Sequence, residues 1–394
     1  MNELQENKEE LNKLQKEYYF DWAATSPADE DILRESLEET MLNWGNPSSS
    51  HAVGKNAKTL LEEARQRAAK ALGVKADNVY FTSGGTESDQ IPLLAQLSKP
   101  LKGTVLISSI EHPAIREQAL AMKHCGWNVV SIPADKNGII TPEAVTQLLT
   151  PETTLVCVMA VNNETGSIQP VYEIADAITS WAQGKRKPKF HVDCVQAAGK
   201  INLNLSYKGI DSAALSSHKI CGPRGIGILY LKDVQEPFLR GGGQEKGIRS
   251  GTENVFGAVA FSKCLERYYN KDNSEQAKIT KGFVEKLSKL KGCTIVPEGR
   301  LEHPELFSPY VVQAGFAHIP GNVMLRALDS KGLYISTGSA CSSKKNNRPV
   351  LEAMHIPSDV RETSVRFSFG PHTTAQAIQK LYESVCEINE QFNK

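Results

Sequence analysis

The stretch that decides the fold is KFHVDCVQAAG (residues 189–199), followed after a short link by SAALSSHKICGPRGIGILYL (residues 212–231). Each begins with a mostly apolar run, typical of a buried strand, and then turns polar or glycine-rich. An apolar run followed by a helical pattern also occurs at 103–126 and 153–184. Continuous apolar strands that alternate with helices predict an α/β protein with a mostly parallel sheet covered on both faces.

The length of 394 residues exceeds what one core usually serves, so we expect two domains. Beyond residue 252 the pattern changes to a long helical stretch over 255–291 and then to shorter mixed elements, which indicates a smaller α+β domain. We therefore predict a large domain over 18–265 and a small C-terminal domain over 266–394. Residues 1–17 are charged with leucines at helical spacing, and we expect an amphipathic helix or arm.

Composition narrows the class of partner. Lys plus Arg and Asp plus Glu both count 45, so no net charge is available to hold nucleic acid or an anionic membrane. The sequence has no apolar stretch long enough for a membrane span or a signal peptide, which favours a cytoplasmic protein with a small-molecule ligand. The eight cysteines show no C-x-x-C pair and no zinc-type spacing, so we expect reduced thiols, no metal site and at most one or two functional cysteines.

Two charged residues stand at predicted strand ends. Lys219 follows the apolar run 212–215 and precedes a glycine- and proline-rich turn. A lysine in such a turn is usually solvent-exposed, so its importance depends on partners elsewhere in the chain. Asp193 closes the preceding strand, where a buried carboxylate is costly unless a cation meets it. Helix capping is an alternative interpretation of Asp193.

Further polar groups follow other strands. FTSGGTES (81–88) places glycines and hydroxyls before a predicted helix, which suits a phosphate, although a plain turn would look similar. It lacks the Walker lysine and the Rossmann glycine spacing, which argues against an NTPase or a dehydrogenase. His112 in EHPAI follows the strand over 104–109 and could equally be a cap or a core residue. Gln196 follows Asp193 by about one helical turn.

One cofactor accounts for these residues together. Pyridoxal 5'-phosphate needs a lysine for its aldehyde, an acid beside its ring nitrogen, a phosphate cradle, a group against its ring and a donor to its phenolic oxygen. Lys219, Asp193, the 83–86 turn, His112 and Gln196 can supply these functions from strand ends of one sheet. Partial burial beside other polar groups would also lower the pKa of the lysine amine, which must lose its proton to react.

Eight ordered motifs resemble a known family. They are FTSGGTES, EHPAI, VNNETG, HVDCVQAAGK, SSHKICGPRGIGILY, GGGQEKGIRSGTENV, STGSACSS and SVRFSFG. In this order they are similar to the signatures of the pyridoxal-phosphate-dependent cysteine desulfurases of the NifS/IscS type, in the class V aminotransferase superfamily, from residue 18 to the C-terminus. The resemblance implies the fold type I of pyridoxal-phosphate-dependent transferases, with a seven-stranded type of sheet, and a homodimer whose active site lies at the dimer interface.

The resemblance also implies a function for each cofactor residue. Lys219 would bond to the aldehyde, Asp193 would pair with the ring nitrogen, His112 would stack on the ring and Gln196 would reach the phenolic oxygen. The further cofactor contacts that it implies are Asn163 and, for the phosphate, Gly85, Thr86, Ser216 and His218, with Thr252 supplied by the second subunit.

Cys341, in STGSACSS, is the second decisive residue that the resemblance indicates. Its thiolate, favoured by the cations Lys344, Lys345 and Arg348 in what looks like a mobile loop, would attack the sulfur of L-cysteine. L-Alanine and a persulfide on Cys341 would result. The implied acceptor is an iron–sulfur scaffold or a tRNA-thiolation enzyme, and Cys341 could transiently bind an iron–sulfur cluster with a scaffold partner.

The remaining implied functions concern the substrate. Asn163 and Arg366 would fix the substrate carboxylate, Arg366 through its planar fork. Lys219 would take the α-proton, and His112 is a candidate proton donor during sulfur loss. Three alternatives stay open: a selenocysteine lyase, another class V aminotransferase, and a sulfur-relay scaffold without catalysis. Cys341 discriminates against a transaminase, which does not need it.

Overall fold

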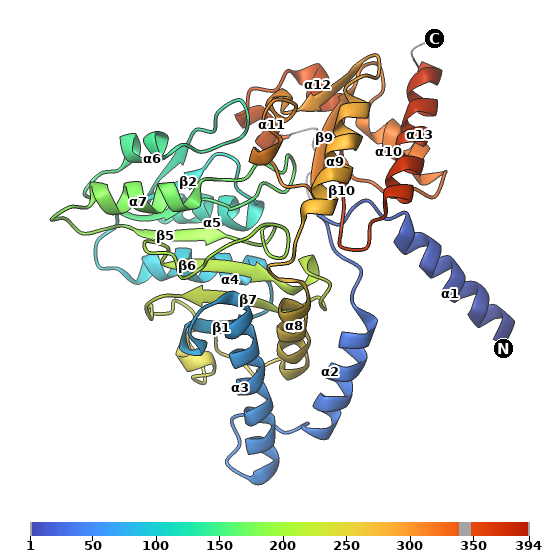
Figure 1. The fold of residues 1–394 in the computed structure, drawn as a ribbon. Coiled ribbons are helices and arrows are strands. Elements are labelled where there is room, and N and C mark those ends of the chain that lie inside the picture. The colour runs from blue at the N-terminus through green and yellow to red at the C-terminus, as the bar shows by residue number, and fades with distance from the viewer. Residues whose placement is uncertain (1, 339–347, 393–394) are drawn as a thin grey trace.

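The computed structural model describes residues 2–338 and 348–392. Within these residues the larger sheet has seven strands in the order β1-β7-β6-β5-β4-β2-β3 (Figure 1). The strands are β1 (Val79–Thr82), β2 (Thr104–Ser108), β3 (Asn128–Ile132), β4 (Thr153–Cys157), β5 (Lys189–Asp193), β6 (Ser212–Ser216) and β7 (Gly227–Leu231). All neighbouring pairs from β3 to β6 are parallel, whereas β7 runs antiparallel to β6 and β1. The predicted mostly parallel α/β sheet is confirmed.

Both faces of this sheet are buried, as the apolar strands predict. Along β2, Val105 and Ile107 belong to one apolar cluster whereas Leu106 belongs to another, because successive side chains point to opposite faces. Helices α4 and α5 lie over the face that carries Val105, and helices α3, α6, α7 and α8 lie over the face that carries Leu106. The helices are α3 (Ala52–Leu72), α4 (Gly85–Leu94), α5 (Pro113–His124), α6 (Pro142–Leu148), α7 (Val171–Trp181) and α8 (Val255–Tyr268).

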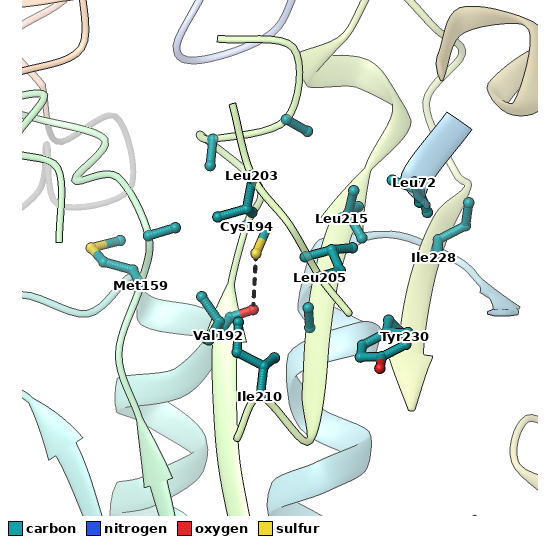
Figure 2. Close-up of a cluster of buried hydrophobic side chains, with 14 of the residues drawn as sticks. Leu72, Met159, Val192, Cys194, Leu203, Leu205, Ile210, Leu215, Ile228 and Tyr230 are labelled. Carbon is teal, nitrogen blue, oxygen red and sulfur yellow. Dashed lines mark hydrogen bonds between the residues drawn. The ribbon is translucent and has the colours of Figure 1, made fainter. Parts of the chain in front are cut away.

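Cys194 illustrates the buried cysteines among the residues that the structure describes. It is fully buried, and its Sγ lies 3.5 Å from the carbonyl oxygen of Val192 among Leu203, Leu205 and Ile210 (Figure 2). The seven cysteines in the described ranges are free thiols, and four of them are buried. A buried thiol packs as a small apolar group, which fits the expectation that most of these cysteines are structural.

The smaller sheet is antiparallel, with the order β10-β9-β8. Its strands are β8 (Cys293–Val296), β9 (Val311–Phe316) and β10 (Ser364–Ser368), and the helices of this part are α9 (Ser274–Leu287), α10 (Gly321–Asp329), α11 (Pro349–Ala353), α12 (Ser358–Thr363) and α13 (Ala375–Phe392). The single helical stretch predicted over 255–291 is wrong. It is divided into α8 and α9, because Tyr269 is extended and Asn270 adopts the left-handed φ of 54°.

The segment between α1 (Asn2–Glu17) and α2 (Glu30–Leu42) joins the two sheets. Phe20 lies in the apolar cluster of the smaller sheet, and its N–H donates to the oxygen of Tyr334 at 2.7 Å. The N–H of Ser368 donates to the oxygen of Phe20 at 2.8 Å. Helix α1 projects from the rest of the chain (Figure 1). The predicted domain boundary at residue 265 falls inside α8 and stays a prediction.

Among the described residues, none forms a helix that combines the length and the apolar character needed to cross a bilayer.

Candidate active site

The predicted functional residues come from one edge of the larger sheet. The parallel strands β2, β4, β5 and β6 end at the same edge, and β1 ends there too because β7 runs opposite to both of its neighbours. A cavity of about 520 Å³ opens at this edge. Ligands of open α/β sheets bind at the carboxyl ends of their strands, so this cavity is the candidate active site.

Most of the predicted site residues line this cavity. They are Gly85, Thr86, His112, Asn163, Asp193, Gln196, Ser216, His218, Lys219 and Arg366. Thr252 does not line it and is exposed on the surface of the chain. Cys341 lies outside the described residues, and so do Lys344 and Lys345.

Lys219 closes a short 3₁₀ turn (Ser217–Lys219) directly after β6. The turn begins the connection to the antiparallel strand β7, so the lysine stands at the sheet edge and not in bulk solvent. Its Nζ donates to the carbonyl oxygens of Ala23 and Ala24, each at 2.7 Å. These carbonyls come from the segment that joins the two sheets, and they hold the amine at the cavity.

Asp193 ends β5 and is 4% exposed. Its Oδ1 accepts a hydrogen bond from the backbone N–H of Val195 at 2.9 Å, but a turn and not a helix follows, so the helix-capping interpretation is wrong. Burial, followed by the nearby carboxyl of Asp89, raises the pKa of Asp193 to about 8. A carboxyl in this state would ionise readily beside a cation, because the opposite charge offsets the cost of burial.

The turn before α4 brings backbone donors to the cavity. Gly85 is the first residue of α4, and a Cβ at this position would lie 2.7 Å from Cγ2 of Val195, which requires glycine there. Thr86 and Ser216 line the same part of the cavity. The N–H of Ser83 is used differently, because it donates to the carboxylate of Glu87. The free N–H groups of a helix N-terminus favour a phosphate.

His112 is the N-cap of α5 and also lines the cavity. Its Nδ1 accepts from the N–H of Ala114 at 3.1 Å. Burial lowers the pKa of His112 to about 4, with smaller contributions from Lys219 and Arg116. The ring is therefore neutral at pH 7, and because Nδ1 accepts, its proton lies on Nε2. The cap interpretation of this histidine is confirmed, and the same side chain also lines the cavity.

Arg366 lies on β10 and is 3% exposed. Its Nη1 donates to the carbonyl oxygen of Asn163 and its Nη2 to Oδ1 of Asp21, each at 2.8 Å. In the part of the chain that the structure describes, Arg366 Nε and Asn163 Oδ1 are buried without a hydrogen-bond partner. A buried guanidinium and a buried amide with unused polar atoms suit a small polar ligand.

Sequence reasoning missed three buried acids at the cavity, namely Asp89, Glu111 and Glu164. Burial raises the pKa of Glu111 to about 8 and that of Glu164 to about 7. Asp89 contacts Nε2 of His191 at 3.1 Å. Glu111 and Glu164 stand inside quoted motifs, EHPAI and VNNETG, but acids next to a histidine or an asparagine are too common to be singled out from sequence. Across residues 2–338 and 348–392, no group of three or more metal-ligating side chains is placed to hold an ion.

Comparison with known proteins identifies the family. The model of the family described as "Aminotransferase class-V" matches residues 18–381. The chain belongs to the aminotransferase class-V family. It is 36% identical over 386 residues to a NifS/IcsS protein homolog of Lactobacillus delbrueckii subsp. bulgaricus, which covers 95% of this chain and 98% of that protein. The cysteine desulfurase IscS of Methanosarcina thermophila is 35% identical over 389 residues, covering 96% of this chain and 94% of that protein.

Solved structures of this aminotransferase class-V family agree with the fold. A NifS-like protein superposes with a TM-score of 0.85 at 32% identity, covering 95% of this chain and all of that chain. The recognition of a NifS/IscS-like enzyme of this family is therefore confirmed, as is the fold class. The family match begins at residue 18, so α1 precedes the matched region.

Proposed function

We propose that the protein is a cysteine desulfurase that takes sulfur from L-cysteine, releases L-alanine and passes the sulfur to an acceptor. The main support for this proposal is that one cavity is lined by residues from separate segments of the chain, namely Lys219, Asp193, His112 and Arg366. The names of the relatives supply the substrate class, since the Methanosarcina thermophila protein is a cysteine desulfurase IscS.

The residues of the cavity fit pyridoxal phosphate. Asp193 is a buried carboxyl that needs a cation, and a protonated ring nitrogen would supply one. The N-terminus of α4, with glycine where a Cβ would clash, forms a cradle for the phosphate together with Ser216 and His218. Gln196 would hold the phenolic oxygen. When bound, the cofactor supplies an electron sink for the substrate Cα–H bond.

The residues of this chain would then bind the substrate and move its protons. The Nζ of Lys219, as an uncharged amine, would take the proton from the substrate Cα. Arg366 and Asn163, with their unused polar atoms, would hold the substrate carboxylate. The neutral ring of His112 carries a hydrogen on Nε2 with which it would donate a hydrogen bond in the cavity, and it would act as a proton donor during sulfur loss only after taking up a proton.

Cys341 would carry the sulfur. Its thiolate would attack the substrate sulfur, so that an S–S bond forms while the substrate C–S bond breaks. The electron pair of the broken bond stays with the substrate carbon, which takes up a proton to become the methyl group of alanine. The sulfur then remains on Cys341 as a persulfide, and the three-carbon product leaves as alanine. We propose that an acceptor protein, an iron–sulfur scaffold or a tRNA-thiolation enzyme, takes the sulfur from this cysteine.

We further propose a homodimer that completes the site. Thr252 is exposed and outside the cavity, so any contact it makes with cofactor phosphate would be to the site of a second copy. An apolar surface at the end of α2 is available for association. Its exposed side chains are Leu37, Met41, Leu42 and Trp44.

The proposal is tested by incubating the purified protein with L-cysteine and measuring its mass without reduction. A gain of one sulfur atom that maps to the peptide containing Cys341 is expected, together with alanine in the solution. Incubation with L-alanine is the control, because it occupies the same site without offering sulfur. Alanine formation without any protein-bound sulfur would contradict the persulfide step, and no reaction with cysteine would contradict the function.

Asp193→Asn should weaken cofactor binding. The amide keeps the size of the side chain but cannot offer a negative charge to a protonated ring nitrogen. Because hydrogen bonds to charged groups are worth more than neutral ones, we expect the dissociation constant for pyridoxal phosphate to rise ~10- to 100-fold. Equilibrium dialysis measures it, and Asp176→Asn, on the outer helix α7, is the control. Unchanged affinity in Asp193→Asn would remove the carboxylate from cofactor binding.

A further inference from the structure

Lys200 is a buried lysine that the mechanism above does not use. It follows the turn after β5, four residues beyond Gln196, and is only 6% exposed. Its Nζ donates to Oε1 of Gln196 at 2.6 Å. Burying an amine costs free energy of folding, so a buried lysine beside a proposed cofactor residue indicates a function.

The other end of the same amide is also fixed. Nε2 of Gln196 donates to the carbonyl oxygen of Ala23 at 2.8 Å. That oxygen also accepts from Nζ of Lys219 at 2.7 Å. Lys200, Gln196, Ala23 and Lys219 therefore form one continuous chain of hydrogen bonds, and all of them except Lys200 line the cavity.

These contacts determine which way the amide of Gln196 points. The amine of Lys200 meets the amide oxygen, and the carbonyl of Ala23, which can only accept, meets the amide nitrogen. The nitrogen carries two hydrogens and Ala23 uses one. The second stays available to an acceptor in the cavity that Gln196 lines.

We propose that Lys200 is a positioning residue that holds the Gln196 amide so that an N–H, and not the carbonyl, faces the phenolic oxygen of the cofactor. This inference rests on the proposed function, because it assumes pyridoxal phosphate in the cavity. Without Lys200, the amide oxygen of Gln196 would be buried with no donor, and the side chain would turn away to find one.

The electrostatic surroundings of Lys200 are compatible with this function. Burial, with smaller contributions from the cations Lys219 and Arg366, lowers the pKa of Lys200 to about 7, and Cys221 acts in the opposite direction. Its Nζ carries hydrogens both as an amine and as an ammonium, so it can donate to Gln196 in either state.

The test is the pH titration of the visible absorbance of the holoenzyme in Lys200→Met. Donation to the phenolic oxygen favours its ionised form, so losing the donor should make the bound cofactor keep its proton to higher pH. We expect the pKa of the colour change to rise by about one unit. Lys200→Gln, which keeps an N–H donor without the charge, should titrate closer to the wild type.

Two further variants separate positioning from simple charge removal. Gln196→Leu should raise the same pKa, and adding Lys200→Met to it should change little, because Lys200 acts through Gln196. Lys99→Met is the matched control, since Lys99 also donates to a glutamine oxygen, that of Gln96, but does not line the cavity. It should titrate as the wild type.

The outcomes are distinct. A wild-type protein that gains no visible band with pyridoxal phosphate contradicts the proposed function itself. If the band is present but Lys200→Met titrates at the wild-type pKa, or if its shift adds in full to that of Gln196→Leu, the positioning function is wrong while the enzyme assignment stands. If Lys200→Met does not fold, Lys200→Gln decides, because a full shift in that variant contradicts donor positioning.

Discussion

Lys219→Ala is expected to yield a folded but colourless protein. The wild type with pyridoxal phosphate should be yellow, because Nζ of Lys219 can bond to the cofactor aldehyde. Alanine removes that bond and also the base at the substrate Cα. Loss of a positioned proton-transfer group alone should lower the rate of alanine formation by about 10²- to 10⁴-fold. Absorbance spectra and an alanine assay measure the two effects.

Lys232→Ala is the control for this variant, because Lys232 is exposed just after β7 and lies outside the cavity. It should keep both colour and activity. Lys219 also donates two hydrogen bonds to the N-terminal segment, so thermal unfolding of Lys219→Ala should be compared with the wild type. A yellow Lys219→Ala protein with normal activity would show that another amine binds the cofactor.

Cys341→Ser should separate cofactor binding from sulfur transfer. The variant is expected to stay yellow, since Lys219 and Asp193 are intact. Sulfur release from cysteine should fall by ~10³-fold or more, as expected when the nucleophile of a concerted catalytic unit is removed. Sulfide release in the presence of a thiol reductant, with the absorbance spectrum recorded in parallel, measures both properties.

Cys125→Ser is the matched control, because Cys125 is the exposed cysteine among those the structure describes. It should release sulfide as the wild type does. The buried thiols are poor substitutes: burial raises the pKa of Cys221 to about 12 and holds those of Cys157 and Cys194 well above the usual range. Wild-type release by Cys341→Ser would therefore remove this cysteine from the mechanism and not merely transfer its function to a neighbour.

The sheet could be predicted from sequence because its strands carry an unusual signal. β2 and β6 are buried along their whole length and β4 at every position but one, so their apolar runs reflect burial on both faces. The division of 255–291 into α8 and α9 could not be predicted in the same way. It depends on the left-handed conformation of Asn270, and an asparagine in a charged segment does not by itself predict that conformation.

The candidate site was predictable to the extent that its residues follow strands. Asp193 is the last residue of β5 and Lys219 closes the short turn after β6, so a parallel sheet brings them to one edge. The carbonyls of Ala23 and Ala24 were not predictable, because backbone acceptors leave no trace in the residue type and lie almost 200 positions from the lysine. The contact of Asp21 with Arg366 was not predictable either, because the two residues lie far apart in the sequence.

The segment that carries Phe20 and Ala23 acts as a mechanical linkage between the two sheets. The backbone of Phe20 forms hydrogen bonds with β10 and with Tyr334. Three residues later, the carbonyl oxygen of Ala23 accepts a hydrogen bond from Nζ of Lys219. Any rotation of the smaller sheet against the larger one must therefore pull these acceptors along and change how firmly the amine is restrained. Substrate contacts made by Arg366 on β10 would consequently change the position of the carbonyl oxygens that bind Lys219, through the peptide backbone itself.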